Sequence, residues 1–383
     1  MEKQQIHIAL PSTGEQEWLA TRECFDTGWL TQGPKVAEFE RAFAKRHGVR
    51  HAIAVTSCTT GLHLVLAAYG IGPGDEVIVP AFTWVATANV VRFCGATPIF
   101  VDVDIDTYNI DPTLVAEKVT EKTKAIIPVH LFGHPANIDA IAAVIPEDVI
   151  IIEDAACAAG ASYKGKYAGT LGLAGVFSFH PRKTITCGEG GMITTNDDAL
   201  ADKLKMMRSH GATVSEEQRH LGAKPHILPD FNVLGYNYRM TDMQGAVGLV
   251  QLSKLDAFLE ERRYFSQYYR EALAQCLWIK TPVEPVAGDH SWQAFVCLVD
   301  PQIAPMGRNE IMEELNTRGI STRPGTHAVT ELGLYAEHRG CFPNAAFCEA
   351  NTIALPLHNK MSEKDYSYVV DTILSMVPSK VLN

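Results

Sequence analysis

One lysine of the sequence, Lys183, stands where an α/β protein could use an amine as a nucleophile. The segment GVFSFHP before it predicts a strand, which Pro181 ends because proline has no N–H to donate to a sheet. A glycine-rich turn over 188–191 then leads into a second predicted strand, MITTN. An amine on such an irregular connection can be desolvated and held partly neutral, as Schiff-base chemistry requires. An ordinary surface lysine on a hairpin loop would show the same local pattern.

Three further features that could take part in chemistry precede this lysine, each at the end of a predicted strand. The predicted strand HAIAVTS ends at Ser57, and residues 57–59 (SCT) begin a helix. The free N–H groups in the first turn of this helix could bind an anion. Trp84 follows the strand EVIVP, and Asp154 ends the strand VIIIED. Together with Lys183 they offer partners for a phosphate, a flat ring, a pyridinium nitrogen and an aldehyde. Pyridoxal phosphate (PLP) carries these four groups.

Each of the three features also has a structural explanation when it is taken alone. Asp154 could cap a helix, and Ser57 and Thr59 could do the same, because these residue types are favoured at helix N-termini. Trp84 could be an ordinary core residue, which is the commoner place for a single tryptophan. The four features in this order, each at a strand end of one sheet, favour a PLP site.

The elements that must position these residues follow a regular order. Strands and helices alternate between residues 51 and 195, which predicts an α/β fold with a mainly parallel central sheet and helices on both faces. The segment 82–95 is expected to be one of the helices. In such a sheet the carboxyl ends of the strands gather the reactive side chains.

A long helical pattern follows the segment GYNYR, and beyond about residue 260 the pattern becomes that of a smaller α+β unit. We therefore expect a large PLP-binding domain over 1–255, with a helical N-terminal segment, and a small C-terminal domain over 256–383. The long helix could bridge the two. The glycines at 70, 72 and 74 follow a helix and precede a strand, which is the reverse of the order in a dinucleotide-binding motif.

The composition excludes several classes of protein. The 383 residues carry 33 basic and 44 acidic side chains, and a net charge of −11 without a basic stripe disfavours nucleic acid and anionic membranes as partners. The nine cysteines are odd in number and have no CxxC spacing, so neither a disulfide framework nor a metal site is expected. The sequence lacks an apolar signal core and any apolar run near 18 residues. A cytoplasmic enzyme is the expected class.

Nearly the whole chain resembles the sugar aminotransferases of the DegT/DnrJ/EryC1/StrS family, which share the aspartate-aminotransferase fold (fold type I) of PLP enzymes. The segments that carry the resemblance include GWLTQGPKVAEFE, TSCTTGLHLVLAAYGIGPGDEVIVPAFTWVATAN, IIEDAACAAGASYKG, GVFSFHPRKTITCGEGGMITTND and LGYNYRMTDMQGAVGLVQL. The resemblance implies a PLP-dependent transaminase with a mainly parallel sheet and a smaller C-terminal α+β domain.

The resemblance also implies roles around the cofactor ring. Lys183 would be the Schiff-base lysine, Asp154 the partner of the ring nitrogen, and Trp84 the aromatic residue that stacks on the ring. Relatives with histidine at the lysine position are dehydratases, so Lys183 favours amine transfer. Many relatives have glutamine at the position of Cys157, where it contacts the ring hydroxyl, and a thiol is a weaker hydrogen-bonding group.

At the phosphate end, the resemblance implies contacts from Cys58 and Thr59, mainly through backbone N–H groups, and from Ser178. Asn237, in the segment GYNYR, would reach the phosphate from a partner subunit. The active site would therefore be shared across a homodimer.

The expected reaction moves an amino group from an amino acid to a keto sugar in the synthesis of amino sugars. The resemblance implies L-glutamate as the donor and a nucleotide-linked 4-keto-6-deoxyhexose as the acceptor. His180, three residues before the lysine, and His327, in TRPGTHAVTELGLY, are candidates for contact with substrate, although a structural role fits His180 equally. A cyclitol ketone is an alternative acceptor. A PLP-fold protein retained as a non-catalytic regulator is the alternative outside the enzymes.

Overall fold

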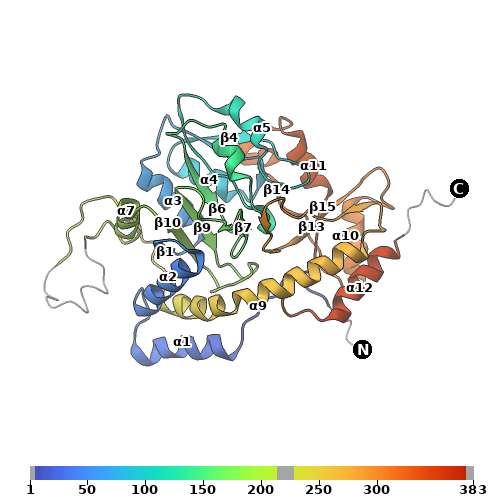
Figure 1. Cartoon of the computed structure of the whole chain (residues 1–383), viewed down its shortest axis with the longest axis horizontal. Helices are drawn as coiled ribbons and strands as arrows, with labels where there is room; N and C mark the ends of the chain where they lie inside the picture. Colours follow the sequence, from blue (N-terminus) through green and yellow to red (C-terminus); the bar gives the residue numbers. More distant parts are fainter. Residues whose placement is uncertain (1–4, 214–227, 377–383) are drawn as a thin grey trace.

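The computed structural model describes residues 5–213 and 228–376, and a seven-stranded sheet with the order β1-β10-β9-β6-β5-β2-β4 forms its centre (Figure 1). The pairs from β4 through β2, β5 and β6 to β9 are parallel, and β10 runs antiparallel between β1 and β9. The predicted α/β class with a mainly parallel sheet is confirmed. The strands are β1 (His51–Val55), β2 (Glu76–Pro80), β4 (Thr97–Val101), β5 (Thr123–Ile126), β6 (Ile150–Asp154), β9 (Ala174–Ser178) and β10 (Gly191–Thr195).

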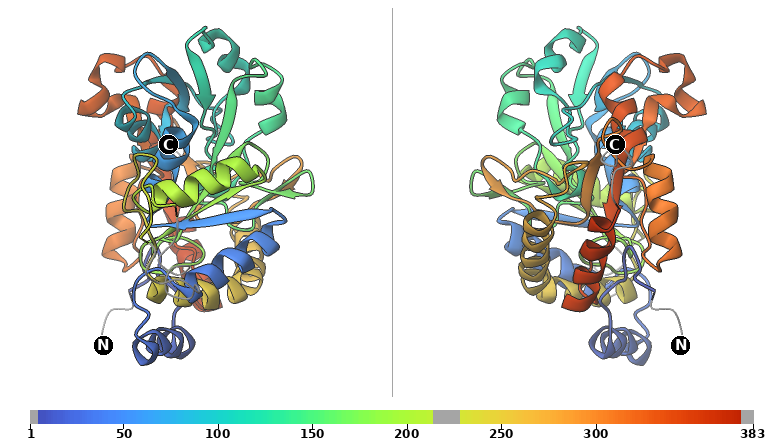
Figure 2. Two further views of the ribbon diagram at one scale, coloured as in Figure 1. Left: turned by 90° about the vertical axis from the view of Figure 1, so that its left-hand side faces the viewer. Right: turned by 90° about the vertical axis from the view of Figure 1, so that its right-hand side faces the viewer.

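Helices cover both faces of this sheet, because successive strand residues point to opposite sides and both sides are apolar. Val176 of β9 packs with the helices α3 (Cys58–Tyr69), α4 (Ala86–Phe93) and α7 (Asp198–Arg208). The next residue, Phe177, packs on the other face against α2 (Pro34–His47) and the 31-residue α9 (Asp242–Ala272). Helix α1 (Glu15–Thr27) packs in turn on α9, at the edge of the molecule (Figure 2).

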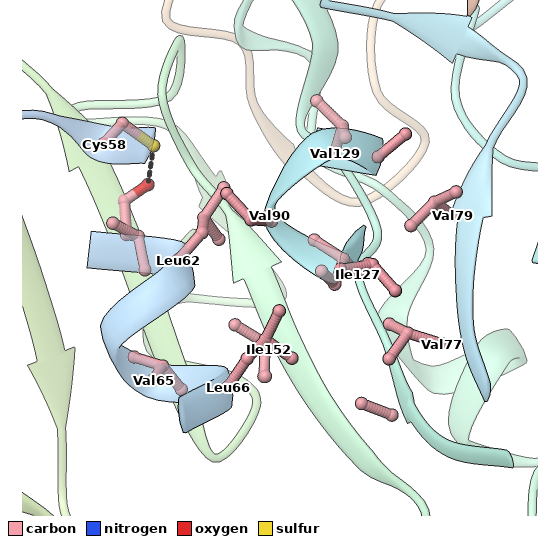
Figure 3. Packing of buried hydrophobic residues seen from close by; sticks show 14 of the residues in the cluster. Cys58, Leu62, Val65, Leu66, Val77, Val79, Val90, Ile127, Val129 and Ile152 are labelled. Carbon is pink, nitrogen blue, oxygen red and sulfur yellow. Dashed lines mark hydrogen bonds between the residues drawn. The ribbon is translucent and has the colours of Figure 1, made fainter. Parts of the chain in front are cut away.

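The core beneath α3 fixes the position of this helix relative to the strand ends. Leu62, Val65 and Leu66 of α3 face Ile152 of β6, with the side chains of β2 beyond (Figure 3). At the first residue of α3, the Cys58 thiol donates to the Val176 carbonyl at 3.4 Å. A fully buried leucine contributes about 1.5–3 kcal/mol of burial free energy, so the N-terminus of α3 is held firmly at the sheet edge.

One predicted helix begins later than expected. The segment 82–95 was predicted to be helical throughout, but Phe82–Thr83 form the short strand β3, and α4 begins only at Ala86. β3 pairs with β14 (His327–Ala328), and the Val329 N–H donates to the Ala81 carbonyl at 2.7 Å. The prediction was wrong at this end because a partner more than 240 residues away captures these backbone groups, which no local pattern reveals.

The C-terminal part forms a second core around a three-stranded sheet of β11 (Ile279–Lys280), β13 (Phe295–Val299) and β15 (Thr352–Leu355), with α10 (Arg308–Thr317) and α12 (Glu363–Leu374). Helix α9 contributes Leu255 to the first core and Tyr269 to the second. The predicted domain boundary at 255/256 falls inside this helix and stays a prediction. Among the described residues, the remaining α-helices and strands are α5 (Pro112–Val115), α6 (Ile138–Ala142), α11 (Pro343–Asn351), β7 (Ser162–Tyr163), β8 (Lys166–Tyr167) and β12 (Gly288–Asp289). Among the described residues, no helix has both the length and the apolar character needed to cross a membrane.

Candidate active site

The carboxyl ends of the central strands open onto a cavity of about 710 Å³, a volume typical of small-molecule sites. The cavity brings together nine of the ten site residues that the sequence singled out. These nine are Cys58, Thr59, Trp84, Asp154, Cys157, Ser178, His180, Lys183 and His327. The tenth, Asn237, is not among the lining residues.

Lys183 lies on the irregular connection between β9 and β10, as the sequence predicts, and its side chain is half-buried. Its N–H donates to the His180 carbonyl at 2.8 Å, which closes a tight turn after the strand. Its Nζ donates to Cys157 Sγ at 3.1 Å, so the amine points across the cavity toward the loop after β6. The alternative of an ordinary surface lysine is therefore wrong.

Asp154, the last residue of β6, is buried at 6% exposure, and its carboxylate is fixed by two donors. Oδ2 accepts from Thr87 Oγ1 at 2.9 Å, and Oδ1 accepts from the Ala156 N–H at 3.1 Å. The Cys58 thiol, which donates to the Val176 carbonyl, lies 3.7 Å from Oδ1. Turns, and no helix, follow this strand, so Asp154 does not cap a helix. A buried, oriented carboxylate at the cavity wall can hold a protonated nitrogen.

The N-terminus of α3 provides free backbone donors in the same cavity. Ser57 caps the helix, because its Oγ accepts from the Thr60 N–H at 3.1 Å. The N–H groups of Cys58 and Thr59 belong to the first turn, where no intrahelical carbonyl is available to them. Gly191 of β10 lies so close that a Cβ there would be 2.7 Å from the Cys58 nitrogen, and only glycine permits this approach.

The Cys58 side chain supports this turn without becoming an anion. Burial raises the pKa of the Cys58 thiol well above its usual range, and the nearby Asp154 carboxylate raises it further. The thiol is therefore a neutral hydrogen-bond donor at physiological pH.

Trp84 and His327 form one wall of the cavity, although 243 residues separate them in the sequence. The indole is 56% exposed, so the alternative that Trp84 is a core residue is wrong. The β3–β14 pairing places His327 opposite Thr83, and the rings of Trp84 and His327 lie 5.7 Å apart at 45°. His327 Nδ1 lies 3.4 Å from Glu349 Oε1.

Ser178 and His180 stand at the end of β9. The Ser178 hydroxyl accepts from the His180 N–H at 3.4 Å, and His180 Nδ1 accepts from the Arg182 N–H at 3.2 Å. Burial lowers the pKa of His180, so the ring is neutral at pH 7. The ring thus both lines the cavity and shapes the turn that carries Lys183.

Asn237 is exposed, and its backbone pairs with Ser209 away from the cavity. The chain just before it exposes Phe231 and Leu234, at 59% and 85%. Within one chain, the structure does not bring this residue to the other candidates.

The structure adds residues that sequence reasoning missed. Thr87, which holds Asp154, lies in the recognised segment TWVATAN, but nothing in the sequence indicates its contact. Arg182, Arg308 and Arg323 also line the cavity. Within the described ranges, no group of His, Cys, Asp and Glu side chains could hold a metal ion.

The residues present fit PLP. The amine of Lys183, the carboxylate of Asp154, the first turn of α3 and the ring of Trp84 face a single cavity. Gly191 leaves the N-terminus of α3 in close contact with the strand next to the lysine. These groups would hold the aldehyde, ring nitrogen, phosphate and ring face of the cofactor.

Comparisons with known proteins agree with this reading. The model of the DegT/DnrJ/EryC1/StrS aminotransferase family matches residues 11–374. The aminotransferase TlmJ from Streptoalloteichus hindustanus is 32% identical, with 97% of this chain and 98% of that chain covered and a TM-score of 0.88. DesV of S. venezuelae, solved with a ketimine intermediate, is 33% identical, with 94% and 93% covered and a TM-score of 0.85. The E. coli GDP-4-keto-6-deoxy-D-mannose-3-dehydratase, solved with hydrated PLP, is 29% identical, with 97% and 100% covered and a TM-score of 0.89.

Proposed function

Since this chain belongs to the DegT/DnrJ/EryC1/StrS aminotransferase family and is a PLP-dependent transaminase, we propose that it transfers the amino group of L-glutamate to a nucleotide-linked 4-keto-6-deoxyhexose. The observation that carries the proposal is the meeting of Lys183 and Asp154 in a cavity large enough for a cofactor and a sugar. A 4-keto-6-deoxy sugar nucleotide appears in the name of the E. coli relative. The amino sugar formed would enter a polysaccharide or a natural product.

When bound, PLP supplies an electron sink for negative charge at the carbon that bears the amino group. Lys183 Nζ would be the base that removes the proton from that carbon and the acid that returns it to the carbon on the other side of the nitrogen. The Cys157 thiol, 3.1 Å away, keeps the amine directed into the cavity. Asp154 holds a negative charge at the ring-nitrogen end, where Thr87 and Ala156 keep its oxygens in place.

The same proposal includes a homodimer with shared sites. Asn237 is exposed and follows the exposed apolar residues Phe231 and Leu234, as a segment that packs on another subunit would be. From there its amide would reach the phosphate site of the partner. We also propose a cytoplasmic location, in line with nine cysteines that are all free thiols.

The first half of the reaction tests the proposal without knowledge of the sugar. The protein is loaded with PLP, L-glutamate is added without an acceptor, and the visible absorbance is followed while 2-oxoglutarate is assayed. We expect the cofactor to convert to its amine form with one equivalent of 2-oxoglutarate, and no conversion in Lys183→Ala. The amine form is then offered keto sugar nucleotides and cyclitol ketones.

Each outcome separates the alternatives. Conversion followed by reaction with a cyclitol ketone alone would replace the sugar with the cyclitol as acceptor. Stable PLP binding without conversion by any amino acid would favour a non-catalytic regulator. Loss of the sugar hydroxyl without net amine transfer would indicate a dehydratase, the activity that Lys183 disfavours.

A further inference from the structure

Glu349 places a carboxylate in the cavity that none of the roles assigned above uses. It belongs to α11 and lines the cavity beside His327. The other two acidic side chains along the cavity are Asp154 and Glu189. Asp154 faces the place of the ring nitrogen, and Glu189 comes from the glycine-rich turn before β10. Glu349 is therefore the acid that the C-terminal part contributes to the site.

The helix that carries Glu349 gains nothing from its charge. Glu349 lies in the last turn of α11, where the backbone carbonyls already present partial negative charge, so a carboxylate is unfavourable there. Arg308 is near enough to interact with it electrostatically. Its guanidinium, however, donates to the Thr352 carbonyl at 2.6 Å and to Asn309 Oδ1 at 2.8 Å. The carboxylate is thus available to a ligand.

His327 is the neighbour of this carboxylate, and its Nδ1 lies 3.4 Å from Glu349 Oε1. A carboxylate only accepts hydrogen bonds, so the imidazole must present Nδ1–H to it, and Nε2 of the neutral ring is then an acceptor. Among the described residues, neither His327 Nε2 nor Glu349 Oε2 has a hydrogen-bond partner. The two side chains stay 46% and 30% exposed along the cavity. The pair therefore offers two hydrogen-bond acceptors side by side.

Fixed backbone holds both side chains in place. His327 belongs to β14, whose pairing with β3 ties it to the central part of the chain. The first turn of α11 is anchored just after β4, where the Asp102 carboxylate accepts from the N–H groups of Asn344 and Ala345 at 3.0 and 2.8 Å. Glu349 follows in the same helix. Acceptors on such rigid elements can discriminate between ligands by the position of their donors.

The charge of Glu349 restricts which part of a substrate can lie against it. A carboxylate repels the carboxylates of an amino acid and the pyrophosphate of a sugar nucleotide, so an uncharged group with O–H or N–H donors fits this place. Two adjacent acceptors suit two adjacent donors, which a sugar ring supplies as neighbouring hydroxyl groups. The ring of His327 lies 5.7 Å from that of Trp84, which would stack on the cofactor ring. The hydroxyls bound here would therefore be close to the ketone that reacts.

We propose that Glu349 and His327 bind the 2- and 3-hydroxyls of the acceptor sugar, an inference that rests on the proposed function. In a 4-keto-6-deoxyhexose, the ketone carbon has two ring neighbours. Carbon 5 bears the methyl group and no hydroxyl, whereas carbon 3 bears a hydroxyl next to that of carbon 2. Carbon 1 carries the nucleotide, so carbons 2 and 3 hold the adjacent hydroxyl pair. Glu349 Oε2 and His327 Nε2 each accept from one of these hydroxyls.

The test uses Glu349→Ala, Glu349→Gln and His327→Ala. The matched control is Glu337→Ala, because Glu337 also has a histidine neighbour, with its Oε1 3.9 Å from His338 Nε2, but lies outside the cavity lining. Each protein is loaded with PLP and converted to the amine form by L-glutamate, and the yield of 2-oxoglutarate shows that it is folded and loaded. It is then offered thymidine, uridine and guanosine diphosphate 4-keto-6-deoxyhexoses. For the sugar that the parent protein aminates, kcat/KM is measured with the full sugar, its 2-deoxy form and its 3-deoxy form.

Glu349→Ala is expected to lower kcat/KM for the full sugar about 10- to 100-fold, but less than about threefold for the deoxy form that lacks its partner hydroxyl. His327→Ala should show the same pattern with the other deoxy form. Glu349→Gln keeps an oxygen acceptor and should lose less than Glu349→Ala, and Glu337→Ala should match the parent protein.

Two results would overturn the inference. Equal losses with all three sugars would show that Glu349 supports the fold of the site and touches no hydroxyl. Unchanged kcat/KM in Glu349→Ala with the full sugar would show that the carboxylate makes no contact. Failure of the parent protein with every keto sugar nucleotide would instead refute the proposed function, and the inference with it.

Discussion

Replacing Glu153 with glutamine tests whether two adjacent carboxylates of β6 have separate tasks. Asp154 points into the cavity, and Glu153 points to the opposite side, because neighbouring strand residues alternate. Glu153 is fully buried and is held by four donors. Its Oε2 accepts from His130 Nε2 at 2.8 Å and from the Gly169 N–H at 2.7 Å. Its Oε1 accepts from the N–H groups of residues 171 and 172 at 2.6 and 2.8 Å.

The cost of the substitution follows from this geometry. Glutamine has one oxygen, so whichever way its amide turns, an NH₂ group faces two donors, which are buried at Oε2 and partly buried at Oε1. His130 cannot adapt by moving its proton, because its Nδ1 already accepts from the Ala136 N–H at 2.9 Å. Each buried donor left without an acceptor costs about 1–3 kcal/mol, so the free energy of unfolding should fall by about 2–6 kcal/mol. That is a large part of the about 5–15 kcal/mol typical of native proteins.

Urea unfolding followed by tryptophan fluorescence measures this loss. With an m-value of about 3 kcal/mol/M, the midpoint of Glu153→Gln should fall by about 1–2 M. The matched variant Asp154→Asn should keep nearly the parent midpoint, because the amide oxygen can still accept from the Ala156 N–H while the Thr87 hydroxyl turns to accept from the amide. It should nevertheless slow the L-glutamate half-reaction by about 10²-fold or more, because the charge that faces the ring nitrogen is lost. Equal midpoints for Glu153→Gln and the parent protein would refute the reasoning. Normal rates in Asp154→Asn would remove its catalytic assignment.

Three further outcomes are expected. Lys183→Ala should abolish the half-reaction while PLP is still retained noncovalently, as a dialysis assay would show. Transamination at the rate of the parent protein would exclude Lys183 as the catalytic lysine. Asn237→Ala should weaken PLP retention, and mixed dimers with Lys183→Ala should regain activity above either parent variant; no gain on mixing would contradict a shared site. Burial lowers the pKa of His47 to about 4, below its ordinary value of 6.5. The free energy of unfolding therefore keeps its full value with respect to His47 above pH 6.5 and falls as the pH drops toward 4, because the unfolded state then binds a proton that the folded state does not. Between pH 8 and pH 5 this loss is about 2 kcal/mol, and His47→Asn should remove it; equal pH slopes would argue against a buried neutral ring.

The central sheet was predictable because its signals are local and repeated. Each strand is an apolar run, and the helical pattern that follows it marks where the strand ends. The alternation over 51–195 therefore predicts the α/β fold class. The strand ends then located Asp154 and Lys183 in sequence, and the parallel sheet brought them together in space. Their meeting follows from topology, although the donors that fix them, such as Thr87, do not.

The pairing of β3 with β14 was beyond the reach of the sequence. The segment 82–95 was predicted to be a helix, but its first two residues, Phe82 and Thr83, form a strand that pairs with His327 and Ala328. Tertiary hydrogen bonds outweigh local propensity, which differs by less than about 1 kcal/mol per residue between most amino acids. The same pairing places His327 beside Trp84, so this missed pairing also determines one wall of the cavity.

Two of the three missed arginines, Arg308 and Arg323, were also beyond the reach of local patterns, because the C-terminal part reaches the cavity only through tertiary contacts. The site can therefore be divided by the part of the chain from which each residue comes. Apart from Asn237, every residue assigned to the cofactor precedes residue 184 and lies at or shortly after the end of a predicted strand. Of the residues left for substrate, Arg308, Arg323 and His327 come from the C-terminal part, where no predicted strand end marks them, and among these three the sequence singled out only His327. Substitutions in the C-terminal segments should therefore change the choice of donor and acceptor while PLP binding stays intact. A comparison of PLP retention with donor range across such variants measures how independent the two sets of residues are.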